Sequence, residues 1–188
     1  MSSRFFSFIG GNSGAWRITR MNALQGAGLG DAAGLEILNE NVATLSVDAK
    51  WVLRGITSNE RYVTQQEHAQ LAASQPPLGR PEASCAALIV IGKSAQWWEL
   101  AQDVRRDILE QQSAHIAIGL RYLPAIARRL HHSRDLGEAY DFVTWFEYAP
   151  EHERAFATLL ETLRQTQEWR YVEREVDIRL TRHAANSI

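Results

Sequence analysis

The sequence predicts an α+β fold in which antiparallel strands and amphipathic helices share one core. Segments with apolar residues at every second position alternate with segments of helical periodicity. At 188 residues, the chain suits one domain, or two small halves that share a core, and it is long enough to bury a pocket. No apolar stretch approaches the roughly 20 residues that a membrane-spanning helix needs. We therefore expect a globular fold with an interior binding site.

The second half predicts six elements in the order strand, helix, strand, strand, helix, strand. Its first strand is a short apolar run, and its second helix begins at Pro150, a residue that is favoured in a first turn. The last strand alternates, with Val176 and Ile178 expected inward and Glu175 and Asp177 outward. This order is the ferredoxin-like arrangement, an open sheet with both helices on one face. The expected elements cover residues 83–92, 95–120, 125–132, 141–148, 150 onward and 170–182.

The first half predicts a shorter copy of the same unit, with strands and one short helix. Gly26–Gly30 resembles a phosphate-binding loop, but no apolar strand leads into it, so a flexible loop is the favoured interpretation. The expected strands are Phe5–Ile9, Trp16–Met21 and 43–53, and the expected helix is Gln65–Ser74, before Pro76. We expect two ferredoxin-like units, residues 1–80 (abbreviated) and 81–188, side by side in a barrel-like fold.

Composition and charge exclude some classes of function. The formal net charge is −2, with acidic and basic residues interspersed. The chain has no basic excess to neutralise a phosphate backbone, so DNA and RNA are not expected partners. The N-terminal segment is too short for a signal-peptide core, and no membrane association is expected either. The cytoplasm is the expected location.

His115 is a polar residue in a position where the helical pattern asks for an apolar one. The pattern predicts a buried stripe through Trp97, Ala101, Val104 and Ile108, and His115 continues it seven residues further on. The residues alone leave two interpretations open, a hydrogen-bonded core histidine or a metal ligand. No second histidine stands at the spacing of a zinc hydrolase motif.

Arg128 breaks the pattern of its strand in the same way. It shares a face with Ile126 and Leu130, where an unpaired guanidinium would be costly. Either the strand lies at a sheet edge and the side chain reaches solvent, or Arg128 marks an anion site in a dry pocket. The neighbouring strand would place aromatic and hydroxyl groups beside it, which suits a flat apolar ligand, although aromatic packing alone could explain some of them. These residues are Phe142, Thr144, Phe146 and Tyr148.

Lys93, Trp97 and Trp98 form a third group directly after a buried strand. A lysine here could meet a ligand carboxylate, and the indoles could cover an apolar ring. The residues alone favour a solvated lysine beside core indoles. Tyr62 could equally hold a carboxylate or pack in the core.

The ordered set of these residues resembles the chlorite dismutase family, in particular its short lineage. The resemblance runs from about residue 43 to residue 180. It rests on the spacing from His115 to Arg128, on the Thr144–Phe146 segment and on the spacing from Lys93 to Trp97 and Trp98. It implies a haem b cofactor, one per chain, and a dimeric α+β barrel, because short members of the family resemble homodimers.

The resemblance also implies a role for each residue. His115 would be the proximal haem ligand, and Glu168 would accept its other ring N–H. Arg128 would be the distal arginine, with Thr144 and Phe146 beside it. The remaining residues would contact the porphyrin: Tyr62 and Lys93 at the propionates, Trp97 and Trp98 on or near the ring.

The implied activity is the conversion of chlorite to chloride and dioxygen. It proceeds through a ferryl oxidant and a hypochlorite-type species, which recombine to form the O–O bond. Relatives of the family decarboxylate coproporphyrin-type haem and typically lack the distal arginine, so Arg128 favours the chlorite reaction. The sequence is also compatible with a haem-binding protein without turnover and with a cofactor-free α+β barrel of the monooxygenase kind.

Overall fold

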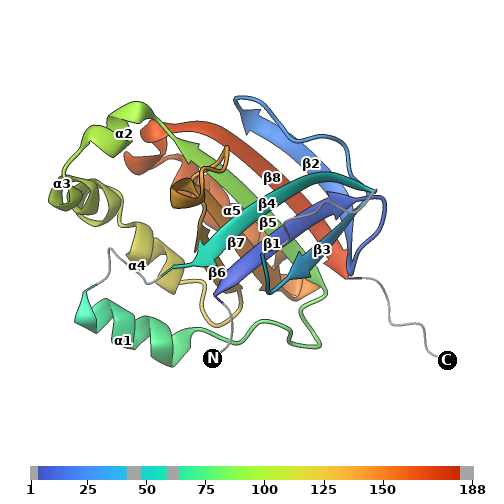
Figure 1. Cartoon of the computed structure of the whole chain (residues 1–188). Coiled ribbons are helices and arrows are strands. Elements are labelled where there is room, and N and C mark those ends of the chain that lie inside the picture. Colours follow the sequence, from blue (N-terminus) through green and yellow to red (C-terminus); the bar gives the residue numbers. More distant parts are fainter. Residues whose placement is uncertain (1–3, 42–47, 59–63, 183–188) are drawn as a thin grey trace.

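Eight strands form a closed antiparallel barrel in the computed structural model, which describes residues 4–41, 48–58 and 64–182 (Figure 1). Their order around the barrel is β1-β3-β2-β8-β5-β7-β6-β4, and β4 also pairs with β1. The closure is tightest between β1 and β4 and between β5 and its neighbours, whereas β2 pairs with β3 only at Trp16 and Arg17. The strands are β1 (Phe5–Gly11), β2 (Trp16–Gln25), β3 (Gly34–Leu38), β4 (Ala49–Thr57), β5 (Cys85–Lys93), β6 (Ala127–His132), β7 (Phe142–Tyr148) and β8 (Val172–Arg182).

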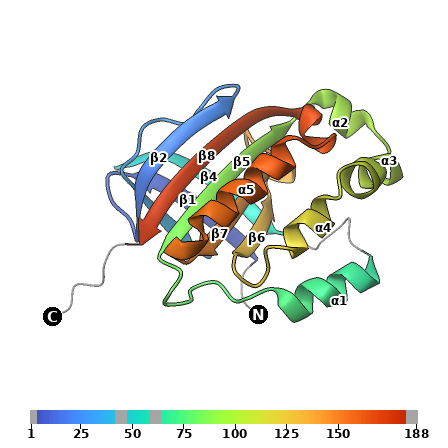
Figure 2. The ribbon, with the colours of Figure 1, turned by 180° about the vertical axis from the view of Figure 1, so that it is seen from behind.

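The helices lie outside the barrel, on one part of its wall. Figure 2 shows α5 lying across the outer face of the sheet, while α1 and α4 lie near the end of β6. In the described part of the chain, no helix is long and apolar enough to span a membrane. The helices are α1 (Gln65–Ser74), α2 (Ala95–Glu99), α3 (Gln102–Arg106), α4 (His115–Leu120) and α5 (Glu153–Arg164), with the short turns η1 (Asp107–Gln112), η2 (Arg134–Leu136), η3 (Pro150–His152) and η4 (Glu168–Tyr171).

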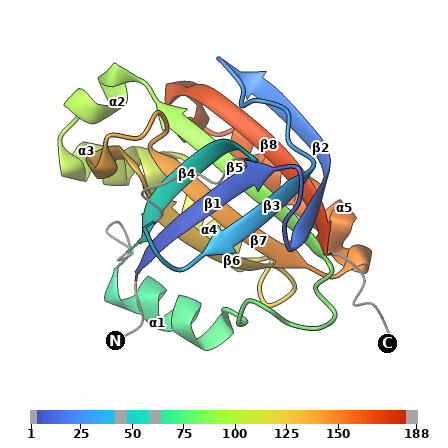
Figure 3. The same ribbon diagram turned by 45° about the vertical axis from the view of Figure 1, so that its right-hand side comes forward.

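The barrel interior is filled by apolar and aromatic side chains from both halves of the chain. Figure 3 shows β4, β1 and β3 side by side in the part of the wall that the first half supplies. Alternation in the strands puts every second side chain inside, such as Val176 and Ile178, both fully buried. The interior cluster contains Phe8, Trp16, Leu35, Trp51, Leu53, Ala86, Leu88, Val90, Tyr140, Val143, Trp145, Val176, Ile178 and Leu180.

A second apolar cluster lies on the outer face, between β5, β7 and the helices. The stripe predicted for the helix after Pro150 is confirmed: Phe156, Leu159, Leu160 and Leu163 of α5 are all buried. They pack against Ala87, Ile89 and Ile91 of β5, whose other face fills the barrel. The sheet is therefore covered on both sides, which explains why β5 is apolar at nearly every position.

The predicted order of elements in the second half is confirmed, but the continuous helix over residues 95–120 is wrong. The chain leaves helical geometry at Leu100 and Ala101, and again at Ala114. Because the helix is broken, the periodicity does not carry across it. Val104 is 42% exposed, whereas Trp97 and Ile108 are buried as predicted.

In the first half, two strands and the helix appear where the sequence predicts them, and one strand was missed. The helix α1 has the predicted bounds, and β1 and β2 begin at the predicted residues. The strand predicted over residues 43–53 is described from Ala49 on as β4, and residues 42–47 lie outside the described residues. The missed strand is β3, whose five residues follow a glycine-rich segment and are too few to show a clear alternation.

Candidate functional site

A cavity of about 310 Å³ lies between the outer face of the sheet and the covering helices. Its volume and its largely apolar walls are typical of pockets for small molecules and cofactors. The walls come from β5, β6 and β7 on one side and from α4, α5 and η4 on the other. The lining residues are Thr57, Ser58, Gln75, Ile89, Ile91, Lys93, Trp97, Leu109, His115, Ile116, Arg128, Arg129, Leu130, His132, Phe142, Thr144, Phe146, Leu159, Leu160, Leu163, Glu168 and Trp169.

His115 enters the cavity from the helix wall, as the first residue of α4. Its side chain is 27% exposed, and its Nδ1 atom lies 2.6 Å from Oε2 of Glu168. With the carboxylate as acceptor, Nδ1 carries the proton and Nε2 is the nitrogen with a lone pair. The geometry favours the ligand interpretation over that of a core histidine, because the ring lines a cavity instead of packing in a cluster.

Glu168 is a buried carboxylate held between two cationic or proton-donating groups. Its Oε1 atom accepts a hydrogen bond from Nζ of Lys93 at 2.7 Å, and Oε2 faces His115. Burial alone would raise the pKa of Glu168, but the neighbouring His115 and Lys93 outweigh it and lower the pKa to about 2. The carboxylate is therefore ionised at neutral pH, which fixes the tautomer and the orientation of the imidazole.

Lys93 has a different environment from the one that the sequence suggested. Its side chain is only 3% exposed, and its ammonium lies 4.6 Å from the centre of the Trp97 ring as well as on Glu168. The interpretation as a solvated lysine is therefore wrong, and the proposed contact with a ligand carboxylate stays a prediction. Lys93 compensates the buried charge of Glu168 behind the histidine.

Arg128 enters the same cavity from the sheet wall, on β6. Its guanidinium packs on the backbone of α4 at Gly119, where an added Cβ would come within 2.5 Å of Nη1. Its carbonyl oxygen accepts a hydrogen bond from the Gln75 side chain at 2.7 Å. At Arg128, β6 pairs with β7 alone, because the pairing with β4 is confined to His131 and His132. The side chain nevertheless lines the cavity and lies against Gly119 of α4. The pocket interpretation is the one that the geometry favours.

Thr144 and Phe146 line the cavity beside Arg128, on β7. Arg128 is opposite Phe146 in the strand register, and Leu130 is opposite Thr144. Phe142 lines the same wall, whereas Tyr148, one further step along this face, stacks on Phe156 with ring centres 4.6 Å apart and does not line the cavity. The predicted wall is therefore present, without Tyr148.

The two tryptophans after β5 have different surroundings. Trp97 is 2% exposed and lines the cavity, and its buried Nε1 has no hydrogen-bond partner among the described residues. The Nε1 atom is inaccessible to solvent, so the ring contributes apolar surface to the cavity wall. Trp98 does not line the cavity. It stacks on Phe142 and donates to Asp141 at 3.2 Å, so it supports the wall from behind.

Tyr62 lies outside the described residues, so its predicted contact with a carboxylate stays a prediction. Trp169 lines the cavity and Gly119 lies against the Arg128 guanidinium, although the sequence pattern selected neither residue. A glycine inside a helical pattern is a signal of close approach that could have identified Gly119. Nothing in the local pattern distinguishes Trp169 from a core tryptophan.

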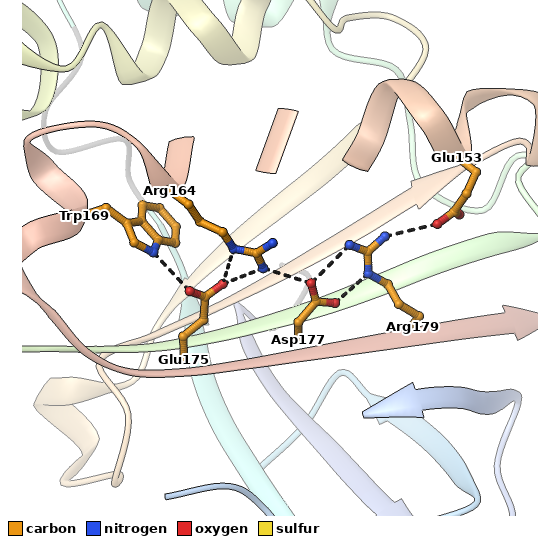
Figure 4. A network of polar contacts seen from close by, with 6 residues as sticks. All are labelled: Glu153, Arg164, Trp169, Glu175, Asp177 and Arg179. Atoms are coloured by element: carbon orange, nitrogen blue, oxygen red, sulfur yellow. Dashed lines mark hydrogen bonds and ion pairs between the residues drawn. The ribbon is translucent and has the colours of Figure 1, made fainter. Parts of the chain in front are cut away.

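A chain of buried ion pairs connects the pocket to the far end of α5 (Figure 4). Trp169 donates its indole N–H to Glu175 at 3.0 Å, and Arg164 bridges Glu175 and Asp177 at 2.6 and 2.8 Å. Glu175 and Asp177 point away from the barrel interior, as predicted, but this face of β8 is not open to solvent. Both are 3% exposed, because α5 covers this face of β8.

The same network determines the charge of its central carboxylate. Asp177 accepts hydrogen bonds from Nε and Nη2 of Arg179 at 2.5 and 3.1 Å, and Arg179 continues to Glu153 at 3.2 Å. Burial would raise the pKa of Asp177, but its hydrogen bonds to Arg179 and Arg164 outweigh burial and lower the pKa. Asp177, the central carboxylate of this network, is therefore ionised at neutral pH. The network holds the Glu168–Trp169 segment in place.

Fold and site together define a barrel protein with a largely apolar pocket on its outer face, lined by His115 on the helix wall and by Arg128 and Arg129 on the sheet wall. The family model described as chlorite dismutase matches residues 32–184. The chain belongs to the chlorite dismutase family. No curated protein matches the chain.

Solved structures support this assignment. A dimeric chlorite dismutase from Nitrobacter winogradskyi is 54% identical, with a TM-score of 0.87 over 94% of this chain and 99% of that one. A chlorite dismutase from Candidatus Nitrospira defluvii, in complex with imidazole, is 19% identical, with a TM-score of 0.65 over 96% of this chain and 92% of that one. The second likeness shows a shared fold.

Proposed function

We propose that this protein is a haem b-dependent chlorite dismutase that converts chlorite to chloride and dioxygen. The observation that carries the proposal is the pair of His115 and Arg128 in one apolar cavity, the first on the helix wall and the second on the sheet wall. Family membership supports the reaction, and the arrangement of these two side chains supports the cofactor.

The residues present fit haem b. The His115 imidazole, with its Nδ1 bound to the Glu168 carboxylate, would hold the haem iron through Nε2. Trp97 lines the cavity and would cover apolar porphyrin surface. When bound, the haem iron supplies the redox chemistry by which chlorite loses an oxygen atom and dioxygen forms.

Two residues, Glu168 and Lys93, act together on the proposed iron ligand His115. Glu168 is ionised and accepts the His115 N–H, so it makes the imidazole more electron-donating. Lys93 balances the charge of Glu168 and limits this effect, because part of the carboxylate's negative charge is directed at its ammonium. We therefore assign Lys93 to the ligand side.

On the sheet wall, Arg128 holds the anionic substrate. A guanidinium stays charged at every working pH and can bind an oxyanion through two N–H groups. In a cavity with apolar walls this attraction is stronger than in water, so it also retains a reactive anion between the steps of the reaction. Phe146 excludes water beside Arg128, and the Thr144 hydroxyl offers one further hydrogen bond.

The test is to reconstitute the purified protein with haem b, record the ferric Soret band and add chlorite in an oxygen electrode. A Soret band with oxygen release supports the proposal. A Soret band without oxygen release contradicts it and favours a coproporphyrin-haem decarboxylase or a haem-binding protein without turnover. Absence of a Soret band contradicts haem binding altogether and favours a cofactor-free barrel.

His115→Ala should abolish stable haem binding, because it removes the axial ligand that the cavity provides. The measurement is the Soret absorbance that remains after gel filtration of the reconstituted protein. His152→Ala is the matched control, since His152 lies in η3 and does not line the cavity. Full retention of haem by His115→Ala would exclude His115 as the ligand.

Arg128→Ala should retain haem but lose most sustained oxygen release, roughly a hundredfold or more in rate. Without the fixed cation, chlorite binds weakly and hypochlorite leaks and bleaches the haem. Arg128→Lys keeps a charge without the bidentate geometry and should fall between Ala and the parent protein. The control is Arg20→Ala on the exposed face of β2, and an unchanged oxygen yield in Arg128→Ala would remove the anion role.

The finer points of assembly belong to the same proposal. We propose two ferredoxin-like units, residues 1–80 and 81–188. Their support is a repeated strand order: around the barrel, the four strands of each half follow one another as the fourth, first, third and second in sequence. These runs are β4-β1-β3-β2 and β8-β5-β7-β6. The 54% identical relative described as dimeric supports a homodimer. We also propose a cytoplasmic location, with chlorite as the small-molecule partner.

A further inference from the structure

The backbone immediately before His115 has an unusual conformation. Ala114 has φ 50° and ψ 34°, and it is the one non-glycine residue with positive φ in the described part of the chain. A Cβ atom makes this left-handed region unfavourable, and residues held there against that cost often lie next to functional groups. Ala114 ends the turn that separates η1 from α4, so its conformation sets the direction in which His115 leaves the chain.

The first turn of α4 is capped by a side chain from the preceding turn and not by its own N-cap residue. Ala114 occupies the N-cap position but has no side-chain acceptor for the first free N–H groups of the helix. Glu110, in the preceding turn η1, takes over this task. Its Oε2 atom accepts the N–H of Ile116 at 2.8 Å, and Oε1 accepts that of Ala117 at 3.4 Å.

Glu110 also holds the other end of the same turn. Its backbone carbonyl oxygen accepts the N–H of Ala114 at 2.9 Å, so its main chain and its side chain contact both flanks of His115. Because the carboxylate holds the first turn of α4, the chain cannot relax Ala114 to a common conformation without breaking these bonds. The left-handed residue and the carboxylate depend on each other.

The turn is also connected to the carboxylate that contacts the imidazole. Ser113 is 5% exposed, and its Oγ atom accepts the backbone N–H of Glu168 at 2.9 Å. The spacing between His115 and Glu168 is therefore set by two neighbouring residues of one turn, since Ser113 holds Glu168 and Ala114 aims His115. A change in the conformation of this turn would therefore alter the positions of both His115 and Glu168.

We infer that Glu110 is a positioning residue: it holds the Ser113–Ala114 turn in its left-handed form and so directs the His115 imidazole into the pocket and onto Glu168. The part of this inference that concerns haem rests on the proposed function. The part that concerns the His115–Glu168 contact does not, because both partners of that contact belong to this chain.

The first measurement uses the unloaded full-length protein. The hydrogen bond between His115 Nδ1 and Glu168, at 2.6 Å, should give a far-downfield imidazole N–H signal in proton NMR, assigned by its loss in Glu168→Gln. Glu110→Ala should broaden or remove this signal, and Glu110→Gln, which keeps one acceptor oxygen, should weaken it. Gln111→Ala is the control, because Gln111 is the next residue of the same turn and is exposed.

Rescue separates positioning from general stability. Glycine adopts positive φ without the cost of a Cβ, so Ala114→Gly should restore the signal in the Glu110→Ala background. A cap that merely stabilises the fold would not give a rescue confined to this turn. An unchanged signal in Glu110→Ala, or equal loss in Gln111→Ala, overturns the inference, as does failure of Ala114→Gly to restore any of it.

The second measurement is the rate of haem transfer to an excess of apomyoglobin. We expect haem to leave Glu110→Ala roughly tenfold faster than the parent protein, the size of a typical capping contribution. Gln111→Ala should match the parent. If the parent binds no haem, the proposed function fails while the NMR result still decides the role of Glu110. If the parent binds haem and Glu110→Ala releases it at the same rate, the positioning role toward haem is overturned.

Discussion

The two faces of β8 have different environments although both are buried. On the inner face Val176, Ile178 and Leu180 are at most 2% exposed and pack in the apolar barrel. On the outer face Glu175 and Asp177 are nearly as deeply buried, under α5, but they are paired with arginines. Burial is thus similar on the two sides, and the difference lies in what covers each face.

The two faces therefore contribute differently to the protein: the inner face contributes packing stability, and the outer face carries the candidate site. The barrel interior is filled by apolar and aromatic side chains, so it contributes mainly packing energy. The outer face combines an apolar cluster, a buried ion network and the cavity with His115 and Arg128. Charged groups there are held by several partners each, which is what a site needs in order to keep its side chains fixed.

We expect the largest loss of stability from a substitution in the buried ion-pair network of the outer face. Asp177→Asn keeps the shape but leaves Arg164 and Arg179 without their shared carboxylate, so the free energy of unfolding should fall by about 3–5 kcal/mol. Denaturant unfolding followed by tryptophan fluorescence measures this. Glu82→Gln, which breaks the exposed pair with Arg80, should cost less than about 1 kcal/mol. Equal decreases in the free energy of unfolding of the two variants would show that the buried ion pairs contribute no more to stability than the exposed pair.

The barrel side can be tested through its inward imidazole, His131. The ring packs edge-on against Phe6 and Phe8, and its Nδ1 donates to the carbonyl of Val143 at 3.0 Å. Burial lowers its pKa from 6.5 to about 4, and the nearby positive charges of Arg129 and His132 act in the same direction. The unfolded chain therefore binds a proton at a higher pH than the folded one.

The sign of the pH dependence follows from that difference. Above pH 6.5 His131 is neutral in both states and adds no pH dependence. As the pH falls from 6.5 to about 4, this residue should reduce the free energy of unfolding by up to about 3 kcal/mol. His131→Gln removes the titration, so its stability should vary less over this range. A parallel pH profile for parent and variant would assign the acid sensitivity to the outer face.

The smallest effect is expected from a substitution at Gly119, the position on α4 against which the Arg128 guanidinium packs. Gly119→Ala places a methyl group within 2.5 Å of the guanidinium, which must shift while keeping its charge. Since the side chain is flexible, unfolding free energy should change by less than about 1 kcal/mol, and alanine itself favours the helix. The KM for chlorite should rise several-fold in the haem-loaded protein. An unchanged KM would mean that the contact with Gly119 plays no part in placing Arg128.

Two residues of the site were predictable because they contradicted the expected pattern: His115 was selected from an apolar stripe and Arg128 from an apolar strand face, and both line the cavity. For His115 the stripe itself does not exist, since the helix is broken at Ala114 before it reaches this residue. The environment of Lys93 was not predictable, because it depends on Glu168, which lies 75 positions further along the chain. Likewise Val104 fits a helical stripe that the break at Ala101 ends.

The sequence by itself determined the order of the strands in the second half, the stripe of α5 and the candidate side chains, because alternation and helical periodicity are properties of neighbouring residues. Only the tertiary structure decided that the charged face of β8 is buried, that Ala114 turns His115 toward Glu168, and that Lys93 lies behind the histidine. Each of these depends on which distant segment packs on the residue. A pattern of neighbours defines a face, and the rest of the folded chain decides what that face contacts.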